Sequence, residues 1–449
     1  MRSNRSTKGL GRAGMAALIL CGLAASLFAA SRRDAPASAS PEFLATMQKQ
    51  TDARPAIMAK AKQLLAGRYD LSGRTDPVAR MSGGKPLPVG PTARLARGVT
   101  WEALAGMPAD EIKRKALFPY IPLPHPLEPD GGGMVFPESQ LATHPELDRV
   151  DVAFDIPDAY LPEFPPPLYL TTRPGRGDMA RGQEISLKNY YPLLKDHLTP
   201  LQLDGARLLV TPFPQQQFNQ TEDRATWASS DGVSCFSCHV NGHTTGQFHR
   251  VPDVRPNADR PRIETVTLRG VFTQRTFGSK RNLRSLEDFT EVENNTAYFD
   301  GDDATGQRKG ARHFTRAELA AMAAFQNIID FPPAPKLLPL GDLDRTKATP
   351  AELRGEAVFR GKGQCATCHA GAYFTDNLSH DLQVERFYAG MPEGIFKTFP
   401  LRGIKDSPPY LHDGRLLTLE DTVEFFNLVL ERKLTAEEKR DLVAYMRAL

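Results

Sequence analysis

Two pentapeptides of this chain place a pair of cysteines directly before a histidine, at the same spacing. The first spans Cys235–His239 and the second Cys365–His369, and both read C-x-x-C-H. Two thiols one helical turn apart can form thioethers to the two vinyl groups of one porphyrin, and the next histidine then faces the iron. The motifs therefore predict two covalently bound c-type haems. The expected haem-binding residues are the cysteines Cys235, Cys238, Cys365 and Cys368 and the proximal iron ligands His239 and His369.

Other interpretations of the two motifs are weaker. A redox-active C-x-x-C pair belongs to a strand–helix–strand pattern, which neither motif shows. A zinc site built from four cysteines gives no reason for a histidine after both pairs. Chance is negligible, because the chain has five cysteines and four of them are in the motifs.

The N-terminus predicts an export signal. Residues 1–30 hold four basic side chains and no acidic one, and Ala13–Ala30 is an apolar run without charge. Small residues at 35–39 offer cleavage sites. Cleavage would leave the mature protein in the periplasm, which agrees with haem attachment outside the cytoplasm. If the segment stays uncleaved, it is a membrane anchor.

Composition sets further limits. The 449 residues suggest two to four domains, and the 37 prolines favour a loop-rich structure with short helices. The formal charge of +3 falls to −1 without residues 1–30. Such a chain has no basic surface for nucleic acid, so we expect no nucleic-acid partner.

An internal repeat organises the second half of the chain. Each unit begins with a glycine on a helix, Gly205 and then Gly355, reaches C-x-x-C-H, and closes with a capped helix. The caps are Thr315 and Thr435, each three residues before a glutamate and ten before an aromatic residue. The glycine lets the opening and closing helices cross closely, with the aromatic residue beside the crossing. The pattern describes a cytochrome c domain.

The predicted fold class is mainly α, with two tandem cytochrome c-type haem domains behind a proline-rich, loop-rich N-terminal extension. A short amphipathic helix is expected over Phe43–Leu65, and His125 and His144 are interpreted as exposed loop histidines. The predicted boundaries are 1–39 for the signal peptide, 40–197 for an extension without an assigned role, 198–331 for the first haem domain, 332–350 for a linker and 351–449 for the second haem domain.

The sixth iron ligands are less clear. His249 follows the first motif at a distance that lets a loop fold over the distal face, so it is a candidate distal ligand or acid–base group. At the second haem the candidates are His380, Met391 and His412. His412 lies in a rigid proline-rich turn without a counterpart in the first unit, and Met391 lies in a loop, where methionine ligands of electron-transfer cytochromes are usual. The alternatives are a structural hydrogen bond for His412 and simple packing for Met391.

The second half of the chain resembles the bacterial di-haem cytochrome c peroxidase family, which includes the MauG-like enzymes. The resemblance covers residues 198–449 and rests on the two C-x-x-C-H motifs, on Phe399–Ile404 and on Pro409–Arg415. It implies a first haem that meets hydrogen peroxide and a second that takes electrons from a protein donor, such as a small cytochrome or a cupredoxin. It also implies an interface between two α-helical domains that can bind Ca²⁺.

Two stretches depart from the family pattern. The family has a tryptophan in the first unit that is thought to help electrons cross between the haems, whereas this chain has Thr276–Arg281 there. On the helix after His412, where the family has a methionine or tyrosine ligand, this chain has Phe425 and Phe426, which cannot ligate iron.

The main hypothesis is an exported di-haem oxidoreductase of the peroxidase type, in which His249 moves the proton for cleavage of the peroxide bond. Glu287 and Glu291 are further candidates, with exposed helix-start carboxylates as the alternative. The alternative function is a non-catalytic periplasmic electron-transfer cytochrome with both haems six-coordinate. A third interpretation is an oxygen-using or protein-modifying relative, since one scaffold can host several chemistries.

Overall fold

The structure is a computed structural model of the 449-residue chain. It describes residues 41–126, 133–147, 152–212, 233–250, 262–278, 283–295 and 314–449. The predicted signal peptide lies outside these residues. By its internal contacts, the chain from Ala39 to Leu449 is one compact unit. None of the helices in the described ranges is long and apolar enough to cross a membrane.

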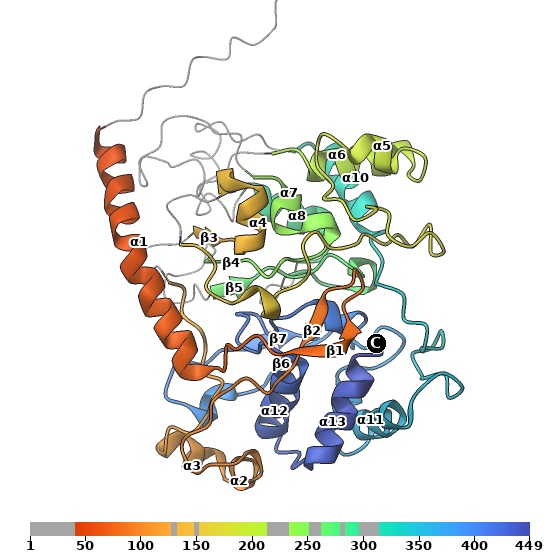
Figure 1. Cartoon of the computed structure of the whole chain (residues 1–449). Helices are drawn as coiled ribbons and strands as arrows, with labels where there is room; N and C mark the ends of the chain where they lie inside the picture. The colour runs from red at the N-terminus through yellow and green to blue at the C-terminus, as the bar shows by residue number, and fades with distance from the viewer. Residues whose placement is uncertain are drawn as a thin grey trace, which may run out of the picture. The chain divides into compact units, whose positions relative to one another are not determined.

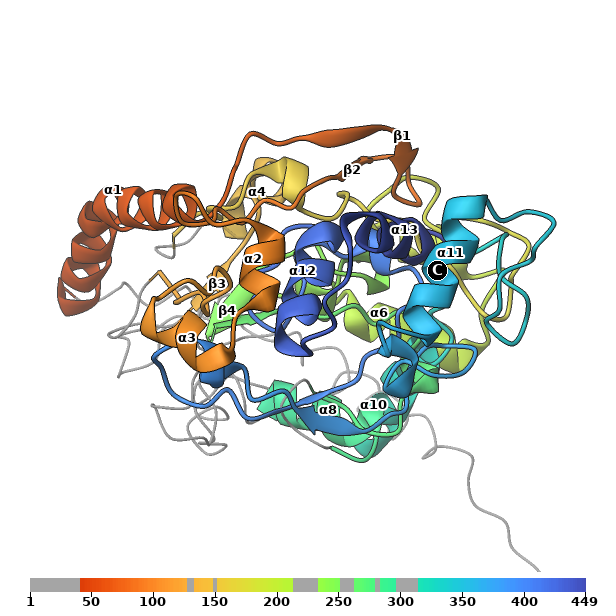
Figure 2. The ribbon, with the colours of Figure 1, turned by 90° about the horizontal axis from the view of Figure 1, so that it is seen from below.

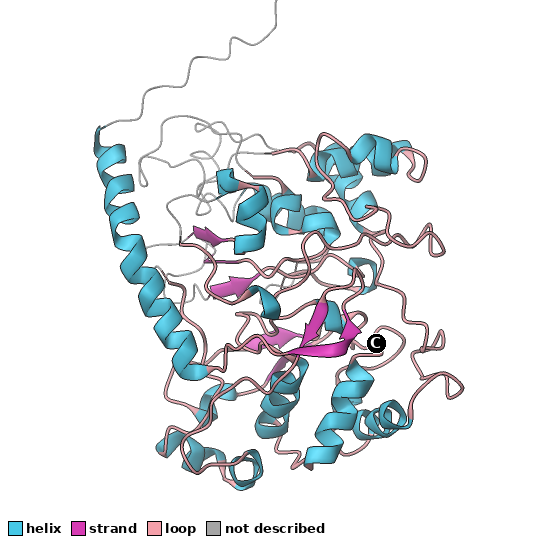
Figure 3. Cartoon of the chain, viewed as in Figure 1, coloured by secondary structure: helices cyan, strands magenta, loops and turns pink. Residues whose placement is uncertain are grey.

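Helices carry most of the regular structure, and the strands are short (Figure 3), which confirms the mainly helical prediction. A helix is present over Phe43–Leu65 as part of the longer helix α1, but its apolar residues do not gather on one face, so the prediction of a short amphipathic helix is wrong. The α-helices are α1 Pro41–Arg68, α2 Trp101–Gly106, α3 Ala109–Arg114, α4 Glu138–Thr143, α5 Tyr190–Leu194, α6 Pro200–Leu209, α7 Cys235–Cys238, α8 Leu286–Asn295, α10 Arg316–Gln326, α11 Pro350–Arg360, α12 Leu419–Val429 and α13 Ala436–Met446. The strands are β1 Thr75–Arg80, β2 Pro86–Pro88, β3 Gly133–Val135, β4 Phe248–Arg250, β5 Arg262–Glu264, β6 Ser379–Asp381 and β7 Ile395–Lys397.

Two pairs of helices cross at a glycine. Helix α6 packs against α10, and α11 packs against α13 (Figure 1). A Cβ atom at Gly205 would lie 1.9 Å from the carbonyl oxygen of Ala321, and one at Gly355 would lie 2.0 Å from that of Asp441. No side chain fits at either crossing without moving a helix backbone. The close crossing predicted for both repeat units is therefore confirmed.

The closing helices begin as the sequence predicts. The Thr315 hydroxyl accepts the backbone N–H of Glu318, and the Thr435 hydroxyl accepts that of Glu438, with the glutamate side chain bonding back in each case. These reciprocal bonds satisfy amide groups that a helix start otherwise leaves without partners. The aromatic residues of these helices, including Tyr445, are fully buried beside the crossings.

The residues before 198 divide between the two repeat units. Leu65 and Tyr120 are buried in the same core as residues of α12 and α13, and α2 packs against α12 (Figure 2). Leu168 and Leu194 share a second core with residues of α6 and α10. The first part of the extension thus packs on the last repeat unit, and its later part packs on the first unit. The predicted domain boundaries themselves stay a prediction.

One buried carboxylate fixes the early extension to helix α12. Asp421, in the first turn of α12, accepts hydrogen bonds from the Thr92 amide at 2.9 Å, the Thr92 hydroxyl at 2.6 Å and the Tyr120 hydroxyl at 3.1 Å. The Thr418 hydroxyl, which caps the helix, donates to the same carboxylate. A loop segment far away in sequence is thereby held against the second repeat unit.

The interpretation of His125 and His144 as exposed loop histidines is wrong. His125 is buried, and its ring packs edge-to-face on that of Phe248. His144 is half-buried, and its Nε2 atom lies 2.5 Å from a carboxylate oxygen of Glu184. Both loops are covered by other parts of the chain, a tertiary effect that loop composition does not reveal.

Candidate haem sites

The second C-x-x-C-H motif follows helix α11. Cys365–Thr367 form a short 3-10 helix, and His369 comes two residues later. The Nδ1 atom of His369 lies 2.9 Å from the carbonyl oxygen of Phe374, and this contact orients the ring. Burial lowers the pKa of His369, so the ring is neutral, as an iron ligand must be. The local geometry fits a proximal histidine.

A cavity of about 360 Å³ lies beside this motif. Cys365, Cys368 and His369 form part of its wall, and Phe396 and His412 form another part. Its volume lies within the usual range for cofactor sites. The motif and the cavity are therefore placed as the attachment of a porphyrin requires.

Three cations in the cavity wall test whether a haem fits. Lys397, Arg402 and Arg432 all line the cavity. The Nε atoms of both arginines are buried and have no hydrogen-bond partner among the described residues. Burial lowers the pKa of Lys397 to about 8. Because buried charges need partners, these side chains are suited to an anionic group, and a haem has two propionates. The residues present fit a c-type haem.

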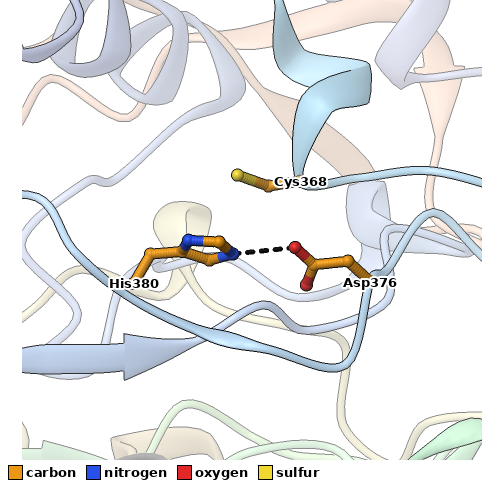
Figure 4. A group of neighbouring side chains, drawn as sticks. All are labelled: Cys368, Asp376 and His380. Atoms are coloured by element: carbon orange, nitrogen blue, oxygen red, sulfur yellow. Dashed lines mark hydrogen bonds and ion pairs between the residues drawn. The ribbon is translucent and has the colours of Figure 1, made fainter.

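Cys368 of the second motif forms a cluster with Asp376 and His380 (Figure 4). The Nε2 atom of His380 is 2.7 Å from a carboxylate oxygen of Asp376, and one ligand atom from each residue lies within 4.8 Å of the others. A thiolate, an imidazole and a carboxylate can together hold zinc. A thioether at Cys368 would remove the thiolate. Within the described part of the chain, the two cysteine pairs do not gather into the four-cysteine zinc site considered from the sequence.

The first motif forms helix α7, which the hydroxyl of Ser234 caps. Burial raises the pKa of Cys235 and of Cys238 to about 12, opposite to the lowered pKa that a redox dithiol needs. Burial lowers the pKa of His239 to about 4, so its ring is neutral. Its buried Nδ1 atom has no hydrogen-bond partner among the described residues. These features fit haem attachment better than thiol chemistry.

Two glutamines, one before and one after the first motif in sequence, donate hydrogen bonds to its carbonyl groups. Gln140, on helix α4 of the extension, donates to the carbonyl oxygen of Ser237 at 2.6 Å, and Gln247 donates to that of Cys238. The Thr245 hydroxyl lies 2.8 Å from the side-chain oxygen of each glutamine and can donate its one hydrogen to either. Sequence analysis missed Gln140, because no local pattern links residue 140 to a motif almost a hundred residues later.

His249 is in strand β4 rather than in the loop that the sequence suggested. Strands β3, β4 and β5 form an antiparallel sheet in which His249 pairs with Met134 and Ile263. Cross-strand partners project from the same face of a sheet. The sulfur of Met134 lies 3.9 Å from that of Cys238, so this face is close to the first motif. Whether His249 acts at the distal side of a haem stays a prediction.

The carboxylates of helix α8 differ in their surroundings. Glu291 lies 3.1 Å from Arg316, which is 74% exposed, so this pair is at the surface. The carboxylate of Glu293 contributes to the raised pKa of Cys235 and of Cys238, and is therefore close to the first motif. Glu293 was not singled out from the sequence.

The candidate sixth ligands of the second site are in different environments. His412 lines the cavity, its ring stacks on that of Phe396 with 4.5 Å between centroids, and its Nε2 atom lies 3.7 Å from Glu393. His380 also lines the cavity. Met391 is 82% exposed and is not among the cavity residues.

A buried arginine fixes the acidic neighbour of His412. Arg415 is fully buried, and its guanidinium binds Glu393 through Nη1 at 2.9 Å and Nη2 at 2.5 Å. Its Nε atom donates to Asp413 at 2.8 Å, and Asp413 also accepts the backbone N–H of Leu123. The turn that carries His412 is thus tied both to Glu393 and to the extension.

A buried ion pair joins the two repeat units. Arg269 lies 3.0 Å from Asp406, and both side chains are almost completely buried. Asp406 also accepts the backbone N–H of Ser82, and its own carbonyl oxygen lies 3.0 Å from Nε2 of His243. The Nδ1 atom of His243 lies 2.7 Å from the Thr267 hydroxyl. His243 therefore joins the two units.

No family model matches the chain. The methylamine utilization protein MauG of Methylorubrum extorquens is 34% identical over 166 residues, which are 31% of this chain and 44% of MauG. The cytochrome-c peroxidase IdrP1 of a Pseudomonas species is 26% identical over 157 residues, or 24% of this chain and 41% of that protein. The chain therefore matches less than half the length of these relatives.

Other similar proteins cover more of the chain at lower sequence identity. The hydrazine synthase gamma subunit of Kuenenia stuttgartiensis is 27% identical over 293 residues, or 53% of this chain and 76% of the subunit. Among solved structures, the hydrazine synthase of this organism aligns with a TM-score of 0.39 at 22% identity over 56% of this chain and 93% of that chain. The di-haem peroxidase BthA of Burkholderia thailandensis aligns with a TM-score of 0.39 at 18% identity over 64% and 94%.

Proposed function

We propose that this chain, a member of the MauG-like di-haem peroxidase family, is an exported oxidoreductase that holds one c-type haem at each C-x-x-C-H motif. The similarity to MauG and to cytochrome-c peroxidases supports the reaction class. The predicted export signal supports a periplasmic location. The observation that carries the proposal is the cavity beside Cys365–His369, with its neutral histidine and buried cations.

Bound haems would supply redox chemistry: the iron at His239 would react with hydrogen peroxide, and the iron at His369 would receive electrons from a donor such as a small cytochrome or a cupredoxin. Reduction of peroxide to two waters consumes two electrons and two protons. The cysteines would fix each porphyrin, and His239 and His369, whose lowered pKa keeps the ring neutral, would each supply a ring nitrogen to the iron. The remaining task of the chain is to deliver protons and to link the sites.

His412 is the better-supported candidate for the distal side of the second haem. It lines the cavity, and Phe396 and Glu393 restrain its ring. Met391 would have to leave a position in which 82% of its surface is exposed before it could reach the cavity. We therefore propose His412 as the sixth ligand and keep Met391 as the weaker alternative.

Proton transfer at the first haem is assigned to His249 or Glu293. His249 shares a sheet face with Met134, which contacts Cys238. Glu293 is close enough to influence both cysteines of the motif. An imidazole or a carboxylate near the bound peroxide would carry the proton for cleavage of the O–O bond.

The first test is a count of covalent haems together with EPR of the fully oxidised protein. Two haems per chain, with one high-spin and one low-spin ferric signal, would support an enzyme with one open iron. Peroxide turnover should then fall in His249→Ala or in Glu293→Gln, whereas Glu291→Gln should retain turnover as a surface control. Fewer than two haems would reject the proposal.

The alternative function is an electron carrier with both irons six-coordinate. The stretch after the first motif favours it, because Phe277, rather than a tryptophan, is buried there. Two low-spin signals that persist after partial reduction, without peroxide turnover, would identify the carrier.

The described residues between the two units do not favour a Ca²⁺ site. The buried carboxylate of Asp406 between the units is already compensated by Arg269 and Lys405. Within the described residues, the cluster with metal-ligand spacing contains Cys368, Asp376 and His380 rather than a set of oxygen ligands.

A further inference from the structure

Lys397 is a buried cation, and the described residues around it include no counter-charge. It ends strand β7, is 6% exposed and lines the second cavity. No carboxylate in the described part of the chain forms an ion pair with it, and burial alone accounts for the lowering of its pKa. Lys439 is almost equally buried, at 8%, but lies 2.5 Å from Glu424. A similarly buried lysine of this chain thus has an acidic partner, whereas Lys397 has none among the described residues.

The ammonium group of Lys397 uses only part of its hydrogen-bonding capacity. It donates to the side-chain oxygen of Gln274 and to the carbonyl oxygen of Thr276. An ammonium group has three donors, so its two acceptors among the described residues leave one donor unused. The group also lies 4.9 Å from the ring centroid of Phe399 and 5.7 Å from that of Phe277. Rings on these sides limit access of water and strengthen any charge interaction.

We propose that Lys397 binds a propionate carboxylate of the second haem and connects that propionate to the Gln274–Phe277 segment of the first repeat unit. The inference rests on the proposed di-haem function. The third donor of the ammonium group would reach the carboxylate from the cavity wall. The other two donors already hold two acceptors of the first unit, so one side chain would contact both the second haem and the other unit.

Arg402 and Arg432 are weaker candidates for this contact. The charge of Asp330 already compensates Arg402 in part. Arg432 lines the same cavity from the segment after helix α12 and is half-buried, so water can solvate part of its side chain. Lys397 combines the deepest burial of the three with the contact to the first unit.

A cation beside a propionate offsets the negative charge that favours ferric iron. Removal of the cation should therefore make the second haem harder to reduce. We expect Lys397→Met to lower one of the two midpoint potentials by about 59 mV, a tenfold change in a one-electron equilibrium. The other potential should stay at the wild-type value. Lys397→Arg keeps the charge, so both of its midpoint potentials should stay close to the wild-type values.

The experiment is a potentiometric titration of the holoprotein, followed by the optical spectrum, with the covalent haems counted in every variant. Lys439→Met is the matched control, because it removes a similarly buried lysine that does not line the cavity. Gln274→Leu should give a smaller shift with the same sign, since it removes one group that positions Lys397.

Unchanged potentials in Lys397→Met with both haems bound would overturn the inference and leave the proposed function intact. Equal shifts in Lys397→Met and Lys397→Arg would also overturn it, because the charge would then be irrelevant. If Lys397→Met does not fold, Lys397→Gln and Lys397→Arg are compared, and equal potentials in these two would have the same meaning. Wild-type protein without two haems would reject the proposed function and this inference together.

Discussion

The backbone amide of Glu264 donates a hydrogen bond of 2.7 Å to the carbonyl oxygen of His412. Glu264 ends strand β5 in the sheet beside the first motif, whereas His412 lines the cavity of the second motif. The main chain of His412 is thus fixed by the first repeat unit, and its ring is fixed by Phe396. A histidine restrained from both sides is well suited to a single, defined position over an iron.

Replacement of His412 should change the coordination of one haem. If His412 is the sixth ligand, His412→Ala should convert one low-spin ferric signal in the EPR spectrum to high spin and leave the haem count at two. Met391→Ala is the matched control and should leave the spectrum unchanged, because its side chain is exposed. The opposite result, with a change only in Met391→Ala, would identify Met391 as the ligand.

Substitution at a helix crossing should be costly. A Cβ atom at Gly355 would approach the carbonyl oxygen of Asp441 to 2.0 Å, so Gly355→Ala must push α11 away from α13. We expect a loss of about 3 kcal/mol in the free energy of unfolding, measured by chemical denaturation. Gly67→Ala on helix α1 meets no atom within 4 Å and should be neutral or stabilise by up to about 1 kcal/mol. Equal effects of the two substitutions would contradict the close crossing.

Removal of the Arg415 charge should destabilise the second unit. Arg415→Met would leave Glu393 and Asp413 buried without their cation, at a cost of about 3–5 kcal/mol in unfolding free energy. Arg354→Met breaks an ion pair with Asp441 whose arginine is 55% exposed, and should cost about 1 kcal/mol or less. A loss in Arg415→Met no larger than that in Arg354→Met would contradict this prediction.

Stability at acid pH should depend on Asp406. Burial by itself would raise the pKa of Asp406, but the charges of Lys405 and Arg269 outweigh it and hold the pKa below the ordinary value of 3.8. An acid whose pKa is lowered by folding contributes stability above its ordinary pKa and loses it as the pH falls through the folded-state pKa. Thermal unfolding between about pH 5 and pH 2 should therefore show a smaller pH dependence in Asp406→Asn than in wild type. Parallel curves would show that Asp406 is not linked to unfolding.

The features that sequence analysis predicted are those with local rules. The crossings at Gly205 and Gly355 follow from a repeat, and the caps at Thr315 and Thr435 follow from a four-residue pattern. Both motif histidines are half-buried, and their role as iron ligands stays a prediction. In each case, residues close in sequence determine the geometry.

The features that sequence analysis missed join distant segments. The contact of Gln140 with Ser237 and that of Met134 with Cys238 each span about a hundred residues, and no periodicity signals them. The partners of Lys397 lie in the other repeat unit. His125 was misjudged for the same reason, since its loop is polar and proline-rich in sequence but is covered by the Phe248 strand.

The bond from Gln140 to Ser237 has a consequence for the assembly of the first motif. The two residues are almost a hundred positions apart, so the carbonyl group of Ser237 gains this partner only when helix α4 packs against the motif. Once the bond forms, helix α4 lies against the motif, and Met134 lies against Cys238. The side chain of Cys238 is therefore covered by residues from outside the repeat, and loss of residues 133–147 would expose the first motif.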